Sequence, residues 1–531
     1  MGSVSERFRL ISGSVPSACQ TQWNKGTGHL PGFHWFQSSY HYLFHSGCCH
    51  DVMSALLGRV GMQTPAVERG PIRDIAQTFK ALGRSIGTTA PISLMQVVNL
   101  YEGPKRARYL KAMQKVERLG YKCCNPKVKM FVKQEALVAR RDKPNPSCRA
   151  IQYRSYEYSL VLATYLKPIE HKLYKTSNVK GFGKLQFMAK NMNSRQRAKL
   201  IVEKFNLIKG CAVLELDAHR FDAHCSKEIL QLEHSVYLAA NNDPAFRKLL
   251  RAQLDNKGRS MDENNPAKYK VIGTRMSGDM NTSGGNCVIM SCLLSYFGRC
   301  HFKHPYELLV DGDDSLLFVD PKDQVPTAQE IYDFFLPLGF RIGVDGVRDR
   351  LEDIRFCKGA VVRLNNEYTM VRDIFLSVQK TLVSPKYLDR AISPKLLKTR
   401  ALGELSLVVG CPIMDVYYRR LIQIADEQMS RRGRKDGGVL NASVLGYRFI
   451  DEFERVPIKI RTAPISDDNR RQISRVFGIS PEQQVVLEAQ LKSLHFSLSA
   501  PLCRNINISC KPWKLTESFP ECLGYLPLAA R

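Results

Sequence analysis

The chain has 531 residues, of which 44% are hydrophobic and 24% are charged, and its 78 Lys and Arg outnumber its 50 Asp and Glu, a formal net charge of +28. This composition is typical of a globular protein and excludes a mostly disordered or collagen-like chain. The excess of positive charge indicates a polyanionic partner, either nucleic acid or an anionic membrane surface, although a generally basic structural protein would show it too.

Cysteine usage and hydropathy bear on the compartment. The 16 cysteines are scattered along the chain, and no CxxC pair occurs. This pattern suits a reducing cytosol and gives little support to a structural zinc site. The best candidate for a membrane span, residues 405–424, contains Asp415, Arg419 and Arg420, so we expect no transmembrane segment.

The first predicted elements are strongly basic. Residues 103–122 have a helical pattern with seven basic side chains and one acidic side chain, Glu117. In the basic segment 126–155, two apolar runs at 128–132 and 136–139 predict short strands that hold the charges in place. A solvated, charged loop is the simpler interpretation of the same segment.

The middle of the chain alternates between strand and helix patterns. In order, these predict a strand at 211–216 ending at Asp217, a helix from the N-cap Ser226 to 241–244, and a buried helix at 286–297 preceded by Gly284 and Gly285. They are followed by strands at 306–310 and 315–319, a helix at 327–336 and a strand near 354–357. Turn residues between the first two of these strands predict a hairpin.

From about residue 370 the pattern becomes mainly helical. One helix start is clear, because Ser480-Pro481-Glu482-Gln483 has a capping Ser, Pro at the first helical position and Gln at the third. Residues 431–438 are rich in charge and glycine and predict an exposed loop.

Three segments occur in a fixed order and call for a common explanation. They are Asp217-Ala-His-Arg-Phe-Asp222 at a strand end, Ser277-Gly-Asp-Met-Asn-Thr282 before a buried helix, and Asp311-Gly-Asp313-Asp314 at a hairpin tip. Two antiparallel strands lying side by side would bring Asp217 and Asp313 together. Carboxylates crowded in this way repel one another unless divalent cations neutralise them. Oxygen ligands without a His or Cys cluster favour Mg²⁺, with Mn²⁺ as a substitute, and paired ions of this kind serve phosphoryl transfer.

The three segments together resemble the palm motifs of RNA-dependent RNA polymerases from positive-strand RNA viruses, and they are most similar to the tombusvirus-like group with its flavivirus-like relatives. The resemblance covers residues 125–360. It is carried by Phe131-Val-Lys133-Gln-Glu135, Arg149, Asp217-x4-Asp222, Arg275-Met-Ser277-Gly278-Asp-Met-Asn-Thr282, Gly312-Asp313-Asp314 and Phe356-Cys357. Ser283-Gly284 departs from the group, which more often has a pair such as Ala-Leu.

The resemblance implies an α+β fold shaped as a right hand, with fingers, a palm whose antiparallel sheet carries the Gly-Asp-Asp hairpin, and a mainly helical thumb. The implied divisions are 1–125 (N-terminal extension and fingers), 126–208 (fingers with the basic motif for the incoming nucleotide), 209–231 (palm, first acidic motif), 232–270 (fingers insertion), 271–360 (palm, small-residue loop and hairpin) and 361–531 (thumb and C-terminal region).

The same resemblance implies roles for individual charged residues. Asp217 and Asp313 would bind the catalytic metal ions, with Asp314 adjacent to them. Lys133 and Arg149 would neutralise the incoming triphosphate, for which arginine offers two parallel hydrogen bonds.

Polar residues near the acids are implied to recognise the sugar. Asp222 and Asn286 would hydrogen-bond the ribose hydroxyls, with Ser277 and Thr282 supporting them. Reading the 2′-hydroxyl distinguishes ribonucleotides from deoxyribonucleotides. For Ser277 and Thr282, plain helix capping is an alternative that is compatible with this role.

Two glycines are implied hinges, and one role is left open. Gly278 would let its loop flex as the template advances, and Gly312 lies in the hairpin turn. Either Arg341 or Arg348 would assist the release of pyrophosphate.

The implied function is that of an RNA-directed RNA polymerase, a nucleotidyltransferase that replicates and transcribes a positive-strand RNA genome. Its partners would be template and product RNA, nucleoside triphosphates and a membrane-anchored viral replication protein that recruits it to membrane-bound replication complexes in the host cytoplasm. A reverse transcriptase would normally have bulky aromatic side chains in place of Asp222 and Gly312. A non-catalytic RNA-binding coat protein would explain the charge but leave the acidic cluster without a purpose.

Overall fold

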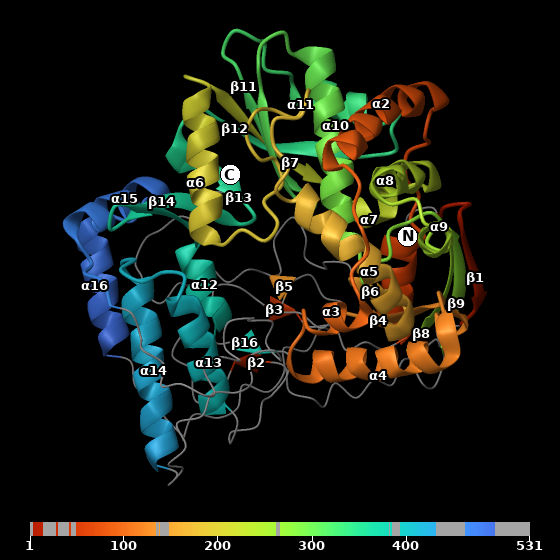
Figure 1. Cartoon of the computed structure of the whole chain (residues 1–531). Helices are drawn as coiled ribbons and strands as arrows, with labels where there is room; N and C mark the ends of the chain where they lie inside the picture. Colours follow the sequence, from red (N-terminus) through yellow and green to blue (C-terminus); the bar gives the residue numbers. More distant parts are fainter. Residues whose placement is uncertain are drawn as a thin grey trace. The chain divides into compact units, whose positions relative to one another are not determined.

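The structure, a computed structural model, describes residues 4–13, 28–29, 42–43, 49–133, 137–138, 148–261, 266–381, 383–384, 393–431 and 462–493. The chain divides into two compact units, of which unit 1 comprises residues 1–20, 47–133 and 147–357, and unit 2 comprises residues 21–46, 134–146 and 358–531. Helices and sheets occur in both units, so the fold is α+β (Figure 1).

A four-stranded antiparallel sheet forms the centre of unit 1. Its order is β10-β11-β7-β12, and its strands are β7 (Ala212–Ala218), β10 (Glu307–Asp311), β11 (Asp314–Val319) and β12 (Ile342–Arg348). The first three are buried on both faces over most of their length, which explains their nearly continuous apolar sequences. Their prediction is confirmed to within two residues. β12 was not predicted, because two glycines and a register shift after Val344 obscure its alternation.

Three long helices of unit 1 pack together beside this sheet. α2 (Arg69–Ile86), α8 (Lys227–Ala240) and α10 (Thr282–His301) contact one another, as Figure 1 shows, and α10 also contacts β10. The predicted N-cap of α8 is confirmed, because the Ser226 hydroxyl accepts a hydrogen bond from the Ile229 amide (3.3 Å).

The start of α10 differs from the prediction. The helix begins at Thr282, so Gly284 and Gly285 lie inside its first turn instead of ahead of it. A Cβ atom on Gly284 would lie 2.8 Å from the Tyr174 hydroxyl, and one on Gly285 would overlap the Glu233 carboxylate. The pair is therefore explained by close packing of the helix and does not mark its beginning.

Unit 1 contains further helical segments. They are α1 (Cys49–Ala55), a π-helical turn (Leu56–Val60), α3 (Leu94–Val98), α4 (Gly103–Leu119), a 3₁₀ turn (Gly120–Cys123), α5 (Tyr156–Leu173), α6 (Ser194–Leu207), α7 (Phe221–His224), α9 (Pro244–Arg251), α11 (Ala328–Phe335) and a 3₁₀ turn (Leu351–Asp353). Of these, α5 is as long as α2 and is largely buried. The predicted helices at 103–122 and 327–336 correspond to α4 and α11. A short strand, β13 (Arg355–Phe356), follows where one was predicted.

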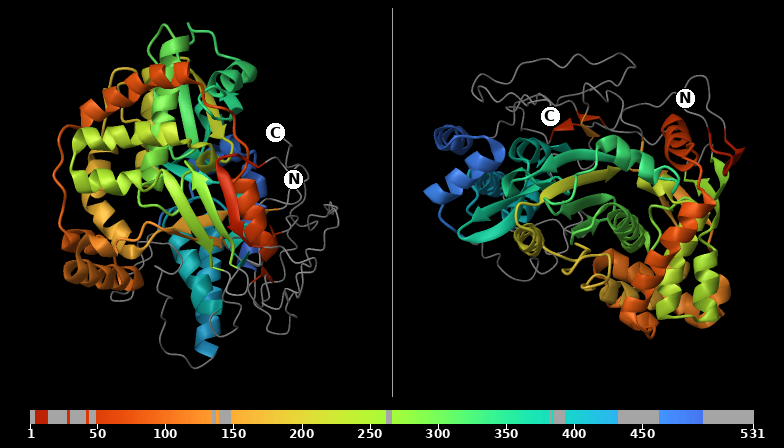
Figure 2. Two further views of the ribbon diagram at one scale, coloured as in Figure 1. Left: turned by 90° about the vertical axis from the view of Figure 1, so that its right-hand side faces the viewer. Right: turned by 90° about the horizontal axis from the view of Figure 1, so that it is seen from above.

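A second sheet of unit 1 has five strands in the order β1-β9-β8-β4-β6 (Figure 2, left). They are β1 (Phe8–Ser12), β4 (Val128–Val132), β6 (Ala150–Tyr153), β8 (Asp255–Ser260) and β9 (Lys268–Ile272). One face is buried in a cluster that includes Met130, Tyr269 and Val271 and residues of α1. Buried and exposed residues alternate along β4, β8 and β9, so the other face meets solvent. The bounds predicted for the strand at 128–132 are confirmed.

Unit 2 is mainly helical, with one hairpin of six-residue strands. Its elements are β2 (Gly28–His29), β3 (Tyr42–Leu43), β5 (Leu137–Val138), β14 (Gly359–Leu364), β15 (Glu367–Arg372), α12 (Ile374–Thr381), β16 (Val383–Ser384), α13 (Ser393–Leu405), α14 (Met414–Arg431), α15 (Asp467–Phe477) and α16 (Pro481–Lys492). The helix start at Ser480 is confirmed, with the full capping box. The apolar run at 136–139 contains β5, which pairs with β3. Arg431, the first residue of the loop predicted at 431–438, is the last residue of α14, and the rest of that loop lies outside the described residues.

The cysteines and the long helices bear on the predictions of a reducing compartment and of no transmembrane segment. The cysteines that the structure describes are free thiols. Among the described helices, none combines the length and the apolar composition that crossing a bilayer requires.

Candidate active site

Acidic residues line up across one end of the four-stranded sheet. Asp311 is paired with Asp314 across the β10–β11 hairpin, and Ser315 is paired with Leu216 of β7. Continuing this register by one residue places Asp314 opposite Asp217. Directly opposed residues of antiparallel strands share a face, with Cβ atoms about 4.5–5.5 Å apart. The sheet therefore brings together acids that lie about one hundred residues apart in the sequence.

The hairpin tip holds the remaining predicted acid, Asp313. Gly312 beside it has a φ of +81°, a conformation that glycine adopts without steric cost, and its amide donates a hydrogen bond to Cys287 Sγ (3.1 Å). Asp217 and Asp313 are exposed and Asp314 is half-buried. These carboxylates are therefore accessible to a ligand from solvent.

Asp311, the first acid of the hairpin, has a different environment. Its carboxylate forms ion pairs with Lys190 and with Arg197 (2.5 Å to Arg197 Nη2). The Arg197 guanidinium also lies 5.6 Å from the centre of the Phe356 ring. Two cations thus neutralise Asp311, which separates it from the accessible acids. Lys190 and Arg197 were not predicted, and no sequence pattern links them to a hairpin more than one hundred residues away.

Whether the predicted metal ions could bind here depends on the donor atoms that the side chains offer. Within the part of the chain that the structure describes, no three His, Cys, Asp or Glu side chains are arranged to bind a metal ion by themselves. Mg²⁺ usually keeps several waters and binds through one or two carboxylates together with substrate phosphates, so a larger protein cluster is not required. The carboxylates of Asp217 and Asp313 have the hard oxygen donors that this ion prefers.

Asp222 lies in α7, just past the end of β7, and is held by a chain of polar contacts. Asn286 Nδ2 donates a hydrogen bond to Asp222 Oδ1 (2.9 Å), and Arg275 Nε donates to Asn286 Oδ1 (3.1 Å). Arg275 is in turn ion-paired with the fully buried Glu233. The Asn286 amide therefore binds the Asp222 carboxylate, the other residue of the predicted sugar-binding pair. Asn286 lies within α10 and does not open it, which corrects the predicted position.

The electrostatics connect this pair with the hairpin. Burial raises the pKa of the Asp222 carboxyl above its ordinary value. The hydrogen bond from Asn286 and the charge of Arg275 oppose this rise in pKa, while the negative charge of Asp313 adds to it. Asp222 and Asp313 therefore lie within electrostatic reach of one another, and a bound cation would oppose the rise in the pKa of Asp222.

The hydroxyls of Ser277 and Thr282 hold a loop in place. Ser277 Oγ donates to the Ala150 carbonyl (2.7 Å) and accepts from the Gln152 amide (3.2 Å), both on β6. Thr282 Oγ1 donates to the Met276 carbonyl (2.8 Å). Neither hydroxyl accepts a hydrogen bond from a helix N-terminus, so the capping alternative is wrong for both. A role in supporting the sugar-binding residues stays a prediction.

Gly278 lies where this loop meets β6. Its amide donates to the Gln152 carbonyl (2.7 Å), and a Cβ atom would lie 2.6 Å from the same oxygen. Next to it, Asp279 is ion-paired with the buried Arg154 (2.7 Å). The structure thus explains the glycine by close packing, and its proposed hinge motion stays a prediction.

The two predicted phosphate-binding residues are neighbours across β4 and β6. The amide of Lys133 donates to the carbonyl of Arg149 (2.8 Å), and the side chains are half-buried and exposed, respectively. Burial raises the pKa of Asp222, and the positive charge of Arg149 offsets a small part of that rise, so this arginine lies within electrostatic reach of the predicted sugar-binding pair.

Comparison with known proteins assigns this arrangement to a family. Residues 25–499 match the family described as viral RNA dependent RNA polymerase. The chain belongs to that family. This confirms the predicted resemblance, and it favours neither the reverse transcriptases nor the coat proteins weighed as alternatives.

Individual relatives are RNA-directed RNA polymerases of plant viruses. The chain is 34% identical to that of oat chlorotic stunt virus over 84% of this chain and 59% of the relative. It is 31% identical to that of tobacco necrosis virus strain A (81% and 58% covered) and 28% identical to that of carnation mottle virus (88% and 60%). The chain therefore spans about three fifths of the length of these polymerases.

Within this polymerase family member, both candidates for assisting pyrophosphate release are already engaged. Arg348 lies 3.3 Å from the Glu215 carboxylate, and Arg341 donates to the Gln63 carbonyl (3.4 Å). Among the described residues, Arg348 is paired with an acid and Arg341 is not, so Arg341 keeps more of its charge available to an anion.

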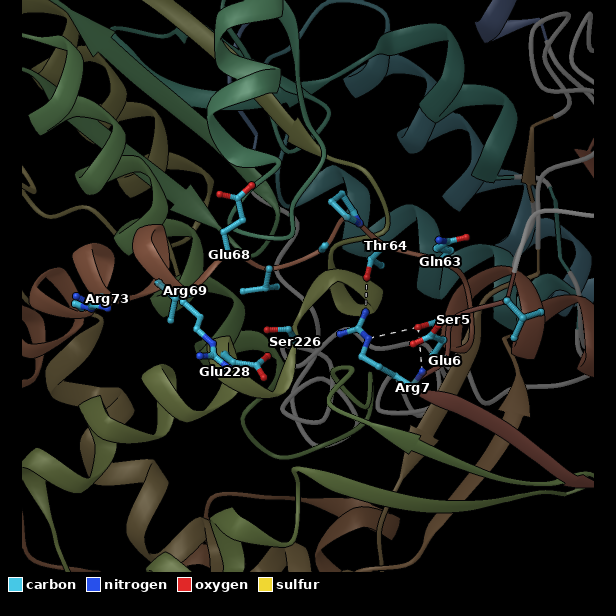
Figure 3. Close-up of a pocket in the computed structure, with 15 residues that line it drawn as sticks. Ser5, Glu6, Arg7, Gln63, Thr64, Glu68, Arg69, Arg73, Ser226 and Glu228 are labelled. Atoms are coloured by element: carbon cyan, nitrogen blue, oxygen red, sulfur yellow. Dashed lines mark hydrogen bonds between the residues drawn. The ribbon is translucent and has the colours of Figure 1, made fainter.

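A cavity of about 770 Å³ lies elsewhere in unit 1 (Figure 3). Three arginines and three glutamates line it, and Arg7 donates hydrogen bonds to Ser5 and Thr64 within it. None of the predicted site residues lines this cavity. Its opposite charges balance one another, so it has no net preference for an anion.

Proposed function

We propose that this chain catalyses template-directed RNA synthesis, joining ribonucleotides to a growing RNA strand. One observation supports this most directly: Asp314 and Asp217 are opposed across the sheet, with Asp313 at the adjoining hairpin tip and within electrostatic reach of the Asp222–Asn286 pair. Carboxylates for metal ions beside a polar pair for the sugar are the two sets of groups that ribonucleotide transfer requires.

Asp217 and Asp313 would hold Mg²⁺, or Mn²⁺ in its place, with Asp314 beside them. When bound, these ions activate the attacking oxygen and stabilise the leaving one in phosphoryl transfer. In the proposed reaction, the 3′-hydroxyl oxygen of the RNA strand bonds to the α-phosphorus of the nucleotide, and the bond from that phosphorus to pyrophosphate breaks.

The remaining groups orient the nucleotide. Lys133 and Arg149 would bind the triphosphate, and their charge would offset its negative charge as it approaches the acids. Asp222 and Asn286 would bind the ribose hydroxyls, with the buried Arg275–Glu233 pair fixing the amide of Asn286. Ser277 and Thr282 would not contact the nucleotide but would hold in place the loop that leads into α10.

The right-hand organisation is part of the proposal. The palm would consist of residues 209–231 and 271–360, which contain the four-stranded sheet and α10. Fingers would be formed by residues 1–208 and the insertion 232–270, and the thumb by residues 361–531, where helices predominate in unit 2.

We also propose partners and a location. Template and product RNA and nucleoside triphosphates would be the substrates, and a membrane-anchored viral replication protein would recruit the chain to replication complexes in the host cytoplasm. The positive charge of the chain is consistent with the RNA substrates.

The proposal is tested by nucleotide incorporation on primed and unprimed RNA templates, with and without Mg²⁺. We expect labelled product that depends on template sequence, ribonucleotides and the ion. RNA binding without incorporation under any of these conditions would contradict it and would favour a non-catalytic binding protein.

A further inference from the structure

The solvent-facing side of the five-stranded sheet in unit 1 carries a dense set of cations. Because buried and exposed residues alternate along the strands, the exposed positions collect on one face. Six basic side chains lie there, contributed by four strands: Arg9 (β1), Lys129 (β4), Lys257 and Arg259 (β8), and Lys268 and Lys270 (β9).

The strand register sets these cations directly opposite one another. In one row, Lys129 is paired with Arg259, and Arg259 is paired with Lys268. In the next row, Lys257 is paired with Lys270, which is paired with Arg9 on β1. Neighbouring strands are about 4.8 Å apart and alternate residues of one strand about 6.6 Å, so the cations form a close grid.

This arrangement is unfavourable for the sheet by itself. Like charges directly opposite one another across strands are destabilising. The one carboxylate on this face within the five strands is Asp255, which lies 3.6 Å from Lys227 outside the sheet. None of the six cations forms an ion pair with a carboxylate among the residues that the structure describes. Among the described residues the grid has no compensating carboxylate, and a polyanion bound over it would relieve the repulsion.

The edge of the grid carries aromatic side chains. Phe131 of β4 is 43% exposed, on the same face as Lys129, and its ring lies 6.0 Å from that of Tyr153, edge to face. Tyr153 is paired with Lys129 and so extends the first row of cations by one strand. Cations beside exposed rings are the combination that binds single-stranded nucleic acid, through phosphates and through base stacking.

We propose that this face, defined by the six cations with Phe131 and Tyr153, is a binding site for single-stranded RNA outside the catalytic centre. The proposal rests on the proposed function for the class of its ligand, and it adds a location and a mode of binding. Phosphates would lie over the two rows, and one or two bases would stack at the aromatic edge. An anionic membrane would be attracted by the same charge, but flat aromatic rings at the edge of a rigid sheet favour bases.

The test removes one row of cations from the full chain. The triple variant Lys129→Gln/Arg259→Gln/Lys268→Gln is compared with Lys175→Gln/Lys209→Gln/Lys322→Gln, which neutralises three exposed cations of unit 1 outside the sheet. The affinity for a single-stranded RNA of about 30 nucleotides is measured from 50 to 200 mM salt, without nucleotides. Each lost phosphate contact lowers the slope of log K against log salt by about 0.7, so the sheet variant should lose about 2 and the control much less.

Three results separate the possible interpretations. Equal slopes for the two triple variants would overturn the proposal, because the charge would then act only as a diffuse field. It would also be overturned if the sheet variant lost binding to vesicles of phosphatidylcholine with about 30% phosphatidylserine while its RNA affinity stayed unchanged. Because the substitutions relieve repulsion between like charges, we expect the melting temperature of the sheet variant to be no lower than that of the wild type. Measuring that melting temperature therefore checks that a changed slope is not caused by misfolding.

RNA binding is measured here without catalysis, so the two proposals can fail separately. A wild-type chain that binds RNA through the sheet but incorporates no nucleotide would contradict the proposed function and leave this site supported. A chain that incorporates nucleotides with equal slopes for both triple variants would do the reverse.

Discussion

The hydrogen bond between Asn286 and Asp222 joins the residues on which the choice of sugar is predicted to depend. Asn286→Ala removes the amide and leaves the Asp222 carboxylate and the Arg275 guanidinium each without one partner. An unpaired buried polar group costs about 1–3 kcal/mol, which corresponds to a roughly ten- to hundredfold loss of discrimination. The measurement is the ratio of kcat/KM for a ribonucleotide and its 2′-deoxy analogue.

A matched control lies on the same helix. Ser291 is fully buried in α10, and its hydroxyl has no hydrogen-bond partner among the described residues. Ser291→Ala should leave the sugar ratio unchanged. If Asn286→Ala also left it unchanged, Asn286 would serve only in packing, and its role in sugar recognition would be wrong.

His224 makes stability depend on pH. Burial lowers the pKa of this imidazole to about 4, and its ring stacks on Phe340 with centroids 6.2 Å apart. In the unfolded chain the ordinary pKa is about 6.5, so the unfolded state binds more protons between these values. The contribution of His224 to the free energy of unfolding is therefore complete above pH 6.5. It is lost as the pH drops toward 4, and the loss amounts to roughly 3 kcal/mol for this residue.

Unfolding by urea at pH 7 and pH 4.5 checks this prediction. His224→Leu should lose less stability on acidification than the wild type. Part of the pH dependence should remain, because burial lowers the pKa of His234 to about 4 as well. An identical loss in the variant and the wild type would show that His224 does not contribute.

Among the elements, α10 depends on close packing at its first turn. Gly285 faces Glu233 and Arg275, where a methyl group would overlap both side chains. Gly285→Ala should therefore destabilise the protein by about 1–3 kcal/mol through overpacking, despite the better helix propensity of alanine. Gly70 in α2 has open space at the same atom, so Gly70→Ala should be neutral or stabilising by up to about 1 kcal/mol. Equal thermal melting of the two variants would contradict this reading of α10.

Elements with local signals could be predicted from the sequence, and those that depend on distant contacts could not. Ser226 and Ser480 cap helices through bonds within three residues, so their patterns sufficed. The β14–β15 hairpin was not predicted, although it has a local signal. That signal is the pair Asn365-Asn366, since both residues adopt positive φ, as a two-residue hairpin turn requires. In the first turn of α10, glycine is required because a Cβ atom would overlap the side chains of Glu170 and Glu233, and no local sequence pattern predicts these contacts.

The candidate site shows the same division. The approach of the first acidic strand to the hairpin could be predicted from strand and turn patterns, but the register sets Asp314, and not the predicted Asp313, opposite Asp217. By contrast, the ion pairs of Asp311 with Lys190 and Arg197 depend on the fold of a separate segment. The ion pair between Arg275 and Glu233, which supports Asn286, is another contact that no sequence pattern predicts.

At the scale of the whole molecule, affinity and chemistry are assigned to opposite charges. In the proposed function, the net charge of +28 would attract RNA phosphates, including those over the proposed sheet face, and the reaction would depend on a few exposed carboxylates. A change at one of these carboxylates should therefore separate the two properties, because it removes chemistry without removing cations.

Asp313→Asn tests this account most directly. The substitution keeps the shape of the side chain and removes one negative charge at the hairpin tip, and Asp349→Asn is the matched control at an exposed acid just past β12, outside the five-stranded sheet. Nucleotide incorporation and RNA affinity are measured on the same preparations. We expect Asp313→Asn to lose at least ~10³-fold in incorporation, with RNA affinity within about twofold of the wild type and little change in the control. Retention of more than about a tenth of wild-type incorporation would contradict the assignment of Asp313 to the catalytic site.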